Sequence, residues 1–525
     1  MTAFTSYVES ILQELADHPE RRVLTTSEGR HITAADFHDS VHRTAAELAD
    51  RGIRRGHTVS MLSGNRPEAL SARYAANLLG ARIVLLYEGQ APETQARVVE
   101  SAETALLLVG PESAKPAAEL LSHLDGAAPD VLLLGPGGSG LDAEDLTAAA
   151  AARPSGRTVE SAARPDDDWC IRYTGGTTGV PKGIQMAHAP YAKAVAYPFE
   201  SAGDPPRLLA CTSLAHLAGQ MSDMTLAAGG SVVLQDTFDT GAVLAAVARE
   251  RITHMWLLPP LLYHLLDHPD LATTDLSSLT RITYGGCPAS PSRLQQGLDV
   301  LGPVLYGWYG QSEALLLTEM GPAEHGRTGQ GGQITVGRPV PGVDIEVRDE
   351  HGHPLPPDTS GEVYVRSEGM MTGYWKKPEL TAQVIRDGWV RTGDIGYLDD
   401  AGYLYLMDRV KDMVIVVGGH VYPGELEDLL HTHPDIAHCA VFGVRTADEV
   451  EEVHCAVVPA PGRTVDPGRI TDFVVAHKGA MYAPSGVHQV DVIPLTSVGK
   501  PDKKRLKAEL VEGKGEGEGK GKGMG

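Results

Sequence analysis

The sequence predicts an α/β fold in its long N-terminal part, followed by a β-rich segment and a small α+β segment. Up to about residue 330, short apolar runs typical of strands alternate with helical patterns of roughly 10–15 residues, which indicates parallel sheets. Beyond that point the chain is rich in Gly, Pro and alternating apolar residues, which favours β-structure. From about residue 408 to about 510, helix and strand patterns mix again. A chain of 525 residues is too long for one hydrophobic core, so we expect several domains.

The N-terminal elements can be placed in order along the chain. We expect an amphipathic helix within the first 20 residues, a hairpin at 21–33, and a helix at 34–52 that ends at Gly52. A short buried strand follows at 57–65. The next predicted helix is RPEALSARYAANLLGA, and the later strand patterns are RIVLLY, ALLLVG, DVLLLG, RLLACTSL, GSVVLQ, THMWLLPP and RITYGG.

The composition argues against several classes of partner. The net charge is −23, so no basic field attracts nucleic acid or an anionic membrane. The five cysteines form no CxxC pair and suggest no metal site, which fits a reduced, cytoplasmic setting. We expect no signal peptide, because the N-terminus lacks a basic region and an apolar core. We expect no transmembrane helix, because no apolar run reaches ~18 residues.

A glycine- and threonine-rich stretch, YTGGTTGVPKG at 173–183, is the first candidate for phosphate binding. Glycines let backbone N–H groups approach a phosphate, threonine hydroxyls add donors, and Lys182 adds a positive charge. The spacing is not that of a P-loop. Taken alone, the stretch fits a hairpin loop with a surface lysine equally well.

A second motif, YGQSE at 309–313, follows the apolar run PVLYGW. The Tyr309 ring can stack on a purine, Ser312 can donate to a phosphate, and Glu313 is a suitable oxygen ligand for Mg²⁺. In isolation, the motif also fits a strand–turn–helix junction with Ser312 as the helix N-cap.

Two further motifs lie closer to the C-terminus. Asp394 lies in a Thr-Gly-Asp turn with Arg409 one hairpin later, and a carboxylate there can accept from both hydroxyls of a ribose. The alternative for that pair is an Asx-turn and a surface arginine. Lys500 follows a glycine in PLTSVGKPDKKRLK, where a solvated basic tail is the alternative.

In order and spacing, these motifs resemble the adenylate-forming superfamily of acyl-CoA synthetases, non-ribosomal adenylation domains and beetle luciferases. The resemblance covers about residues 20–510. It implies a large N-terminal domain of two α/β subdomains and a β-rich subdomain (1–408), and a hinge at 409–412 containing Lys411. A small mobile α+β domain (413–510) follows, and then a tail at 511–525, which we expect to be disordered because of its low complexity.

The resemblance also implies a reaction in two halves. A carboxylate attacks the α-phosphorus of ATP to give acyl-AMP and pyrophosphate, and a thiol, usually of coenzyme A, then displaces AMP. Lys500, Glu313 and Lys182 would be catalytic, with Glu313 holding Mg²⁺, Ser312 touching the α-phosphate, and Lys500 bridging the carboxylate and the α-phosphate. The other expected ATP or AMP ligands are Thr174, Gly175, Gly176, Thr177, Thr178, Gly179, Gly286, Cys287, Trp308, Tyr309, Gly310, Asp394 and Arg409.

The same resemblance suggests where the other substrates bind. The expected acyl pocket consists of His216, Gly219, Gly285, Gly307 and Leu315, which are mostly small or apolar and predict a hydrophobic, bulky acid. A core role for His216 is the alternative. A diterpenoid acid of the platensimycin type is the specific hypothesis. Gly418 and Gly419 would line the channel for coenzyme A. A nucleophilic role for Cys287 is rejected, because a cofactor supplies the thiol in this family.

The chain departs from the family pattern at a few positions. Gly175 replaces a common Ser, Ala215 an aromatic residue and Glu451 a frequent Gly, while Pro501 follows the key lysine. None of these changes removes a charge that the mechanism needs.

Three functions remain as alternatives: an acyl-CoA synthetase, an acyl-AMP ligase that loads a carrier protein, and a luciferase-like or non-catalytic relative. The stretch LAHLAGQ (214–220) has no carboxylate to pair with a substrate ammonium, which disfavours α-amino acids. We therefore expect a cytoplasmic monomer or homodimer that uses ATP, Mg²⁺ and coenzyme A on a carboxylic acid, without nucleic-acid or membrane partners.

Overall fold

The computed structural model describes most of the chain. The described residues are 4–137, 140–174, 182–197, 204–330, 333–409, 414–416, 419–445, 451–496 and 499–511. Gly175–Gly179, Lys411, Gly418 and the tail beyond Val511 lie outside the described residues, as do the side chains of Thr174 and Arg409.

The first large sheet has eight strands in the order β19-β9-β8-β4-β3-β5-β6-β7. Its centre is parallel, whereas β9 and β19 are antiparallel to their neighbours. The strands are β3 (Thr58–Leu62), β4 (Arg82–Leu85), β5 (Thr104–Val109), β6 (Asp130–Leu133), β7 (Glu144–Asp145), β8 (Asp168–Thr174), β9 (Lys182–Ala187) and β19 (Gly373–Tyr374).

The second large sheet has nine strands in the order β16-β15-β14-β13-β12-β10-β11-β1-β2, again with a parallel centre. The predicted hairpin at 21–33 forms its β1–β2 edge. The strands are β1 (Arg22–Thr25), β2 (His31–Thr33), β10 (Arg207–Ala210), β11 (Ser231–Leu234), β12 (His254–Leu257), β13 (Arg281–Gly285), β14 (Leu305–Gln311), β15 (Leu315–Met320) and β16 (Arg338–Pro339).

Helices cover these two sheets and join them in one core. Helix α1 begins with a capping box of Ser6 and Glu9 and buries one apolar face, as its amphipathic pattern predicts. Almost every residue of α3 and α8 is buried, because both helices contribute to the interior of the large domain. The helices are α1 (Tyr7–Asp17), α2 (Ala34–Asp50), α3 (Pro67–Leu78), α4 (Pro92–Ser101), α5 (Ala114–Ser122), α6 (Leu146–Ala151), α7 (His188–Val195), α8 (Leu217–Ala227), α9 (Thr240–Glu250), α10 (Pro259–Leu266), α11 (Pro291–Leu301) and α12 (Pro378–Val384).

The β-rich segment forms a five-stranded antiparallel sheet, as its Gly- and Pro-rich sequence predicts. The 10-residue strand β21 lies between β18 and β22 and carries Asp394. The strands are β17 (Val343–Arg348), β18 (Gly361–Ser367), β20 (Ile385–Arg386), β21 (Trp389–Leu398) and β22 (Leu404–Arg409).

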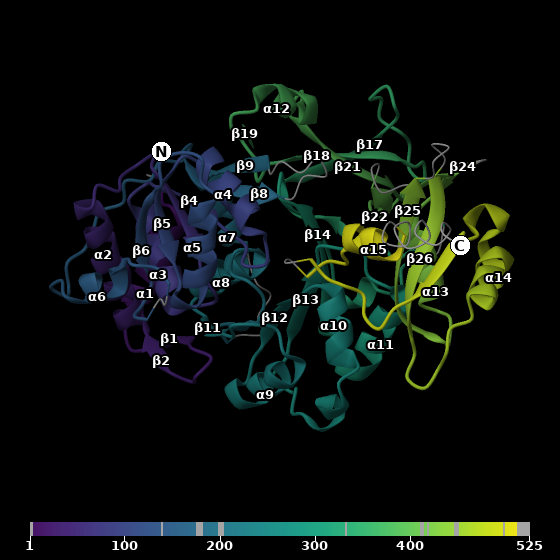
Figure 1. Cartoon of the computed structure of the whole chain (residues 1–525), viewed down its shortest axis with the longest axis horizontal. Helices are drawn as coiled ribbons and strands as arrows, with labels where there is room; N and C mark the ends of the chain where they lie inside the picture. Colours follow the sequence, from purple (N-terminus) through teal and green to yellow (C-terminus); the bar gives the residue numbers. More distant parts are fainter. Residues whose placement is uncertain are drawn as a thin grey trace, which may run out of the picture.

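The C-terminal segment has its own small core on a three-stranded sheet, β25-β26-β27. Figure 1 shows this segment at the opposite end of the molecule from the N-terminal helices. Its elements are β23 (Val414–Val416), β24 (Gly419–Val421), α13 (Pro423–Leu430), β25 (Ile436–Arg445), β26 (Glu451–Pro459), α14 (Pro467–Lys478), β27 (Gly486–Gln489) and α15 (Lys503–Leu510). The predicted fold class is confirmed.

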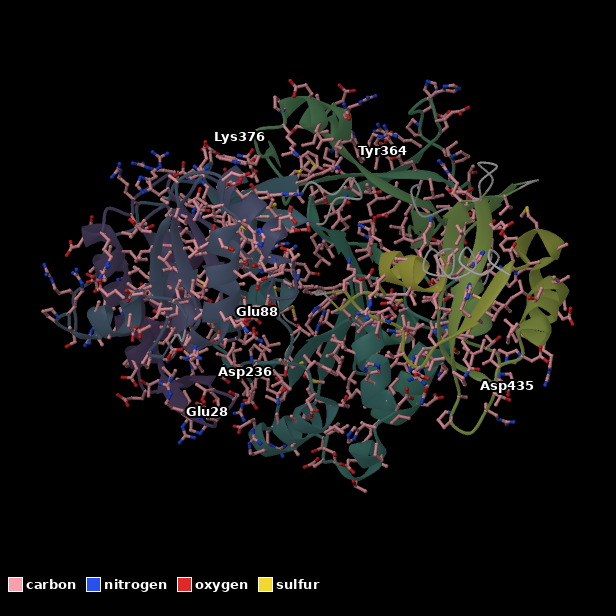
Figure 2. The ribbon with its side chains drawn as sticks, viewed as in Figure 1. Glu28, Glu88, Asp236, Tyr364, Lys376 and Asp435 are labelled. Carbon is pink, nitrogen blue, oxygen red and sulfur yellow. The ribbon has the colours of Figure 1, made fainter. Side chains whose placement is uncertain are left out.

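Charged side chains gather on the outside of the molecule. Figure 2 shows Glu28 and Lys376 near the edge of the molecule, and both side chains are exposed, as is Asp236. No helix within the described ranges is long and apolar enough to span a bilayer.

Candidate active site

The predicted magnesium ligand Glu313 is held by a tyrosine from a distant strand. The Tyr374 hydroxyl donates a 3.0 Å hydrogen bond to Glu313 Oε1, and the Glu313 carbonyl accepts from the Met371 N–H at 2.7 Å. Burial and the nearby Glu313 carboxylate raise the pKa of Tyr374, so the phenol stays protonated and acts as a donor. One segment, from Met371 to Tyr374, thus holds both the backbone carbonyl and the carboxylate of Glu313.

Lys182 belongs to the same cluster. It begins β9, which pairs with the β19 strand that carries Tyr374, and its Nζ lies 5.8 Å from the centre of the Tyr374 ring. The end of the predicted phosphate loop therefore lies beside the predicted metal ligand, although residues 175–181 themselves are outside the described part. Tyr374 could not be predicted from the sequence, because no local motif marks it.

Among the described residues, no group of three or more His, Cys, Asp or Glu side chains could hold a metal ion. The single carboxylate of Glu313 still fits Mg²⁺, because Mg²⁺ is commonly bound through one or two carboxylates together with the phosphates of the substrate. A single carboxylate therefore suits a metal ion that binds together with the nucleotide better than a resident structural ion.

The residues predicted to bind the purine and the ribose, Tyr309 and Asp394, are in direct contact. The Tyr309 hydroxyl donates a 2.6 Å hydrogen bond to Asp394 Oδ2, and the Asp394 side chain is almost completely buried. Asp394 follows Gly393, whose φ of 72° allows the tight turn, and the Asp394 N–H donates to the Thr392 hydroxyl at 3.0 Å. In the backbone register of the β21–β22 hairpin, Asp394 lies opposite Arg409, as the predicted hairpin requires.

Trp308 and Tyr309 are neighbours on β14, so their side chains point to opposite faces of the sheet. The Trp308 indole N–H donates to Glu319, which also accepts from Arg281 at 2.6 Å. The Trp308 side chain therefore lies on the opposite face of the sheet from the Tyr309 side chain that contacts Asp394. Any contact of Trp308 with adenine would have to come from its backbone.

Ser312 lies in the turn of the β14–β15 hairpin, and a strand follows it. The alternative of a helix N-cap at this position is therefore wrong. The hairpin is tight, because a Cβ on Gly310 would come within 2.2 Å of the Leu315 carbonyl oxygen. Leu315 itself has a φ of 57°, which is uncommon for a residue with a branched side chain.

Lys500, from the C-terminal segment, approaches the N-terminal domain at the predicted adenine loop. A Cβ on Gly286 would lie 3.9 Å from Lys500 Cε, and one on Gly499 would lie 3.2 Å from Leu258 Cδ1. The nearby Lys500 charge favours a lower pKa for the Cys287 thiol, but burial outweighs this effect and raises the pKa to about 12. A thiol with such a pKa is a poor nucleophile at neutral pH, which agrees with the rejection of Cys287 as one.

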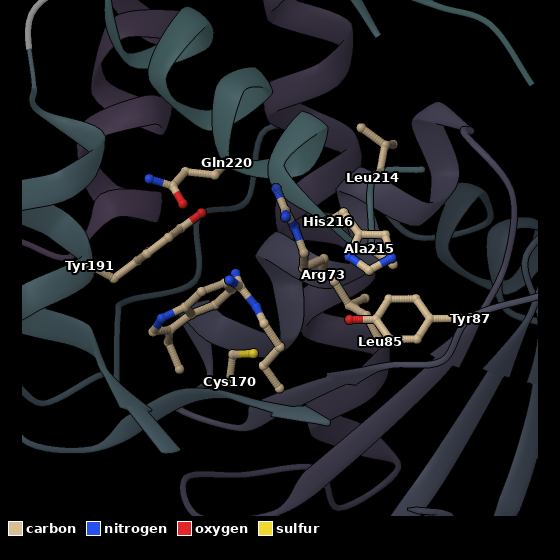
Figure 3. A pocket seen from close by; sticks show the side chains of 11 residues that line it. Arg73, Leu85, Tyr87, Cys170, Tyr191, Leu214, Ala215, His216 and Gln220 are labelled. Atoms are coloured by element: carbon tan, nitrogen blue, oxygen red, sulfur yellow. The ribbon is translucent and has the colours of Figure 1, made fainter. Parts of the chain in front are cut away.

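His216 immediately precedes α8, and its ring stacks on Tyr87 with centres 4.1 Å apart and an interplanar angle of 7° (Figure 3). Burial lowers the pKa of His216 to about 3, helped by the charges of Arg172 and Lys500. The imidazole is therefore neutral at physiological pH.

A small cavity lies against His216 (Figure 3). Its lining residues are Arg73, Leu85, Tyr87, Trp169, Cys170, Arg172, Tyr191, Leu214, Ala215, His216 and Gln220. Four of these side chains are aromatic or imidazole rings, and two are arginines. The cavity is thus more polar than the predicted acyl pocket.

The other predicted acyl-pocket positions do not line this cavity. A Cβ on Gly219 would come within 2.1 Å of the Leu214 carbonyl oxygen, and one on Gly285 within 2.2 Å of the Trp308 carbonyl oxygen. A Cβ on Gly307 would come within 3.0 Å of the Tyr284 hydroxyl and of Met320. These glycines permit close packing, and their role beside an acyl group stays a prediction.

Comparison with known proteins identifies the family. The AMP-binding enzyme family matches residues 12–375, and the AMP-binding enzyme C-terminal domain matches residues 425–500. This chain belongs to the AMP-binding enzymes. The predicted resemblance to the adenylate-forming superfamily is confirmed.

Relatives of this AMP-binding enzyme include several CoA ligases. The chain is 34% identical over 514 residues to the medium/long-chain-fatty-acid–CoA ligase FadD8 of Mycobacterium tuberculosis, with 95% of this chain and 89% of FadD8 covered. It is 33% identical over 484 residues to a feruloyl-CoA synthase of an Amycolatopsis species, with 90% and 92% covered. Among solved structures, the amide bond synthetase McbA from Marinactinospora thermotolerans is 37% identical, with a TM-score of 0.85 and with 96% of this chain and 99% of McbA covered.

The enzyme is accordingly an AMP-forming acid–thiol ligase that works through an acyl-AMP intermediate and uses ATP, Mg²⁺ and coenzyme A. The diterpenoid acid stays a prediction.

Proposed function

We propose that Lys500, Glu313 and Asp394 act at one site, where this enzyme forms an acyl-AMP and then transfers the acyl group to coenzyme A. The observation that carries the proposal is the position of Lys500. It belongs to the C-terminal domain, yet it lies beside Gly286 of the N-terminal domain and its charge acts on His216. A cation from one domain therefore approaches the predicted nucleotide site of the other.

In the first half-reaction, a carboxylate oxygen of the acid attacks the α-phosphorus, the bond to the bridging oxygen breaks, and pyrophosphate leaves. The Lys500 ammonium would balance the negative charge that builds up during this step, which needs no proton transfer. Glu313, oriented by Tyr374, would hold the Mg²⁺ that accompanies the phosphates. Asp394, oriented by Tyr309, would accept from the ribose hydroxyls, and Lys182 would bind the departing phosphates.

In the second half-reaction, the sulfur of coenzyme A attacks the acyl carbonyl and AMP leaves. We propose that the C-terminal domain (413–510) rotates about the hinge at 409–412, which contains Lys411, and presents Gly418 and Gly419 to the thiol arm. Gly419 begins β24, which pairs with β23 in a small hairpin. Glycines there would leave room for a narrow ligand.

The acid and the cellular location belong to the same proposal. A hydrophobic acid agrees with the apolar walls Leu85 and Leu214, and the names of the relatives include a fatty-acid ligase and a feruloyl-CoA synthase. We also propose a cytoplasmic location, because the described cysteines are all unpaired thiols.

The likeness to McbA, an amide bond synthetase, favours a second candidate in which an amine accepts the acyl group from acyl-AMP. A carrier-protein thiol is a third acceptor. The test supplies a panel of fatty and aromatic acids with ATP and Mg²⁺, and measures pyrophosphate, AMP and acylated products. The reaction is run with coenzyme A, with a primary amine, with a phosphopantetheinyl carrier protein, and without an acceptor.

Acyl-CoA as the main product supports the proposal. Acyl-AMP that persists in the presence of coenzyme A and disappears with an amine or a carrier protein identifies that acceptor instead. A panel that gives no acid-dependent pyrophosphate release contradicts adenylation itself.

A further inference from the structure

Several polar side chains in the cavity beside His216 lack hydrogen-bond partners within the described part of the chain, and the buried Trp169 Nε1 and His216 Nε2 are among the atoms concerned. Arg172, on β8, is half-buried and has no carboxylate within ion-pair distance there. The Gln220 amide, on α8, is 4% exposed and makes no hydrogen bond to a described residue. Buried polar groups are almost always hydrogen-bonded, so the unpaired Trp169 Nε1 and His216 Nε2, together with the Arg172 and Gln220 side chains beside them, point to a polar ligand in this cavity.

The second arginine of the cavity is already neutralised. Arg73 pairs with Asp223, and both side chains are almost fully buried. The same carboxylate accepts hydrogen bonds of 2.6 Å from Tyr74 and from Tyr191. The charge of Arg73 is thus balanced by Asp223, so Arg172 is the lining arginine that has no carboxylate partner among the described residues.

Four ring side chains form part of the cavity wall. Trp169 stacks on Tyr191 with centres 3.8 Å apart. Tyr87 stacks on His216, as Figure 3 shows. The space between the lining residues has room for a small group rather than for a whole acid. His216 lines the cavity, and Lys500, which lies beside Gly286, is near enough for its charge to help lower the pKa of His216.

We infer that Arg172 and Gln220 bind a hydrogen-bond acceptor, a carbonyl or carboxylate oxygen, on the part of the acid that is remote from its reacting carboxylate. This inference rests on the proposed function. The preferred substrate is then an aromatic acid with a second oxygen acceptor, and Arg172 is the residue that selects it. Such selection is strong, because an analogue without the acceptor leaves the buried donors unpaired.

The test compares matched acids of similar shape. The three positional isomers of acetylbenzoate are each compared with the isopropylbenzoate isomer that lacks the oxygen. Binding is measured by calorimetry with the full chain and without ATP, and pyrophosphate release is measured in parallel. The variants are Arg172→Leu, Arg172→Lys and Gln220→Leu, and Arg249→Leu on the exposed face of α9 is the control.

We expect at least one acetylbenzoate to bind about tenfold or more tightly than its counterpart. Arg172→Leu should remove this preference and Arg172→Lys should keep part of it, with the KM for ATP unchanged in both. No preference for any isomer, or a preference that survives Arg172→Leu, overturns the inference. A preference in binding without pyrophosphate release from any acid leaves the inference standing and contradicts the proposed function instead.

Discussion

The Tyr309 hydroxyl donates a 2.6 Å hydrogen bond to Asp394, across 85 residues of sequence. This bond joins β14 of the second large sheet to β21 of the β-rich sheet. The residue predicted to stack on adenine therefore orients the residue predicted to bind ribose, and one nucleoside would bridge the two sheets.

Removal of this hydroxyl should weaken ATP binding. A hydrogen bond to a charged group is worth about 1.5–3 kcal/mol, so Tyr309→Phe should raise the KM for ATP by roughly tenfold or more. The KM for the acid should not change. Tyr306→Phe, on the same strand, is the control, since the guanidinium of Arg281 lies 3.9 Å from the centre of its ring and needs no hydroxyl. An unchanged KM for ATP would show that Asp394 does not depend on Tyr309.

Loss of the hydroxyl that holds Glu313 should affect the metal. Tyr374→Phe removes the donor to Glu313 but keeps the ring beside Lys182. We expect the Mg²⁺ concentration for half-maximal pyrophosphate release to rise several-fold, with kcat recovering at saturating Mg²⁺. A lower kcat with unchanged Mg²⁺ dependence would mean that Glu313 does not hold the metal.

The proposed role of Lys500 concerns one half-reaction. Lys500→Ala should reduce acyl-AMP formation by several orders of magnitude, which corresponds to about 4 kcal/mol or more of lost transition-state stabilisation. Thioester formation from supplied acyl-AMP should largely survive. Lys504→Ala, at an exposed position on α15, is the control. Equal loss of both half-reactions would refute domain alternation.

The buried Arg73–Asp223 pair should matter for stability. Removal of one partner leaves an uncompensated charge in the core, so Asp223→Ala should destabilise the N-terminal domain by about 3–5 kcal/mol and lower its Tm by several degrees. Asp344→Ala breaks the exposed pair with Arg366 and should change stability by less than about 1 kcal/mol. Similar melting curves for the two variants would contradict this assignment.

Acid should loosen the contact between the domains. His438 on β25 faces His264 and Asp267 of the N-terminal domain, with Arg293 nearby. Burial lowers the pKa of His438 to about 4 from an ordinary value of 6.5, so the docked state favours the neutral ring. This contribution is complete above pH 6.5 and is lost progressively as the pH falls from 6.5 towards 4.

Acyl-AMP formation should therefore fall faster than thioester formation between pH 7 and pH 5. His438→Gln should flatten the ratio of the two rates. A ratio that does not depend on pH in the unmodified enzyme would rule out this interface as the cause.

The alternation of strands and helices, the first elements of the chain and the order of the motifs could be predicted from the sequence alone. The period of the apolar residues and the local turn chemistry of Gly52 and Gly393 act over a few residues, so they need no knowledge of the fold. The separate candidates Lys182, Glu313 and Asp394 were found for the same reason, because each lies in a short stretch whose composition suits its chemistry.

Contacts between residues that are far apart in the sequence could be identified only in the folded structure. Tyr374 lies 61 residues from Glu313, and no motif connects them. The cavity beside His216 is lined by residues of α3, β4, β8, α7 and α8, which are distant in sequence. Its polarity differed from the expectation of small and apolar residues because β8 and α3 bring Arg172 and Arg73 to positions that no local pattern marks. A side chain's chemistry is set by its sequence, whereas its neighbours, and hence its charge balance, are set by packing.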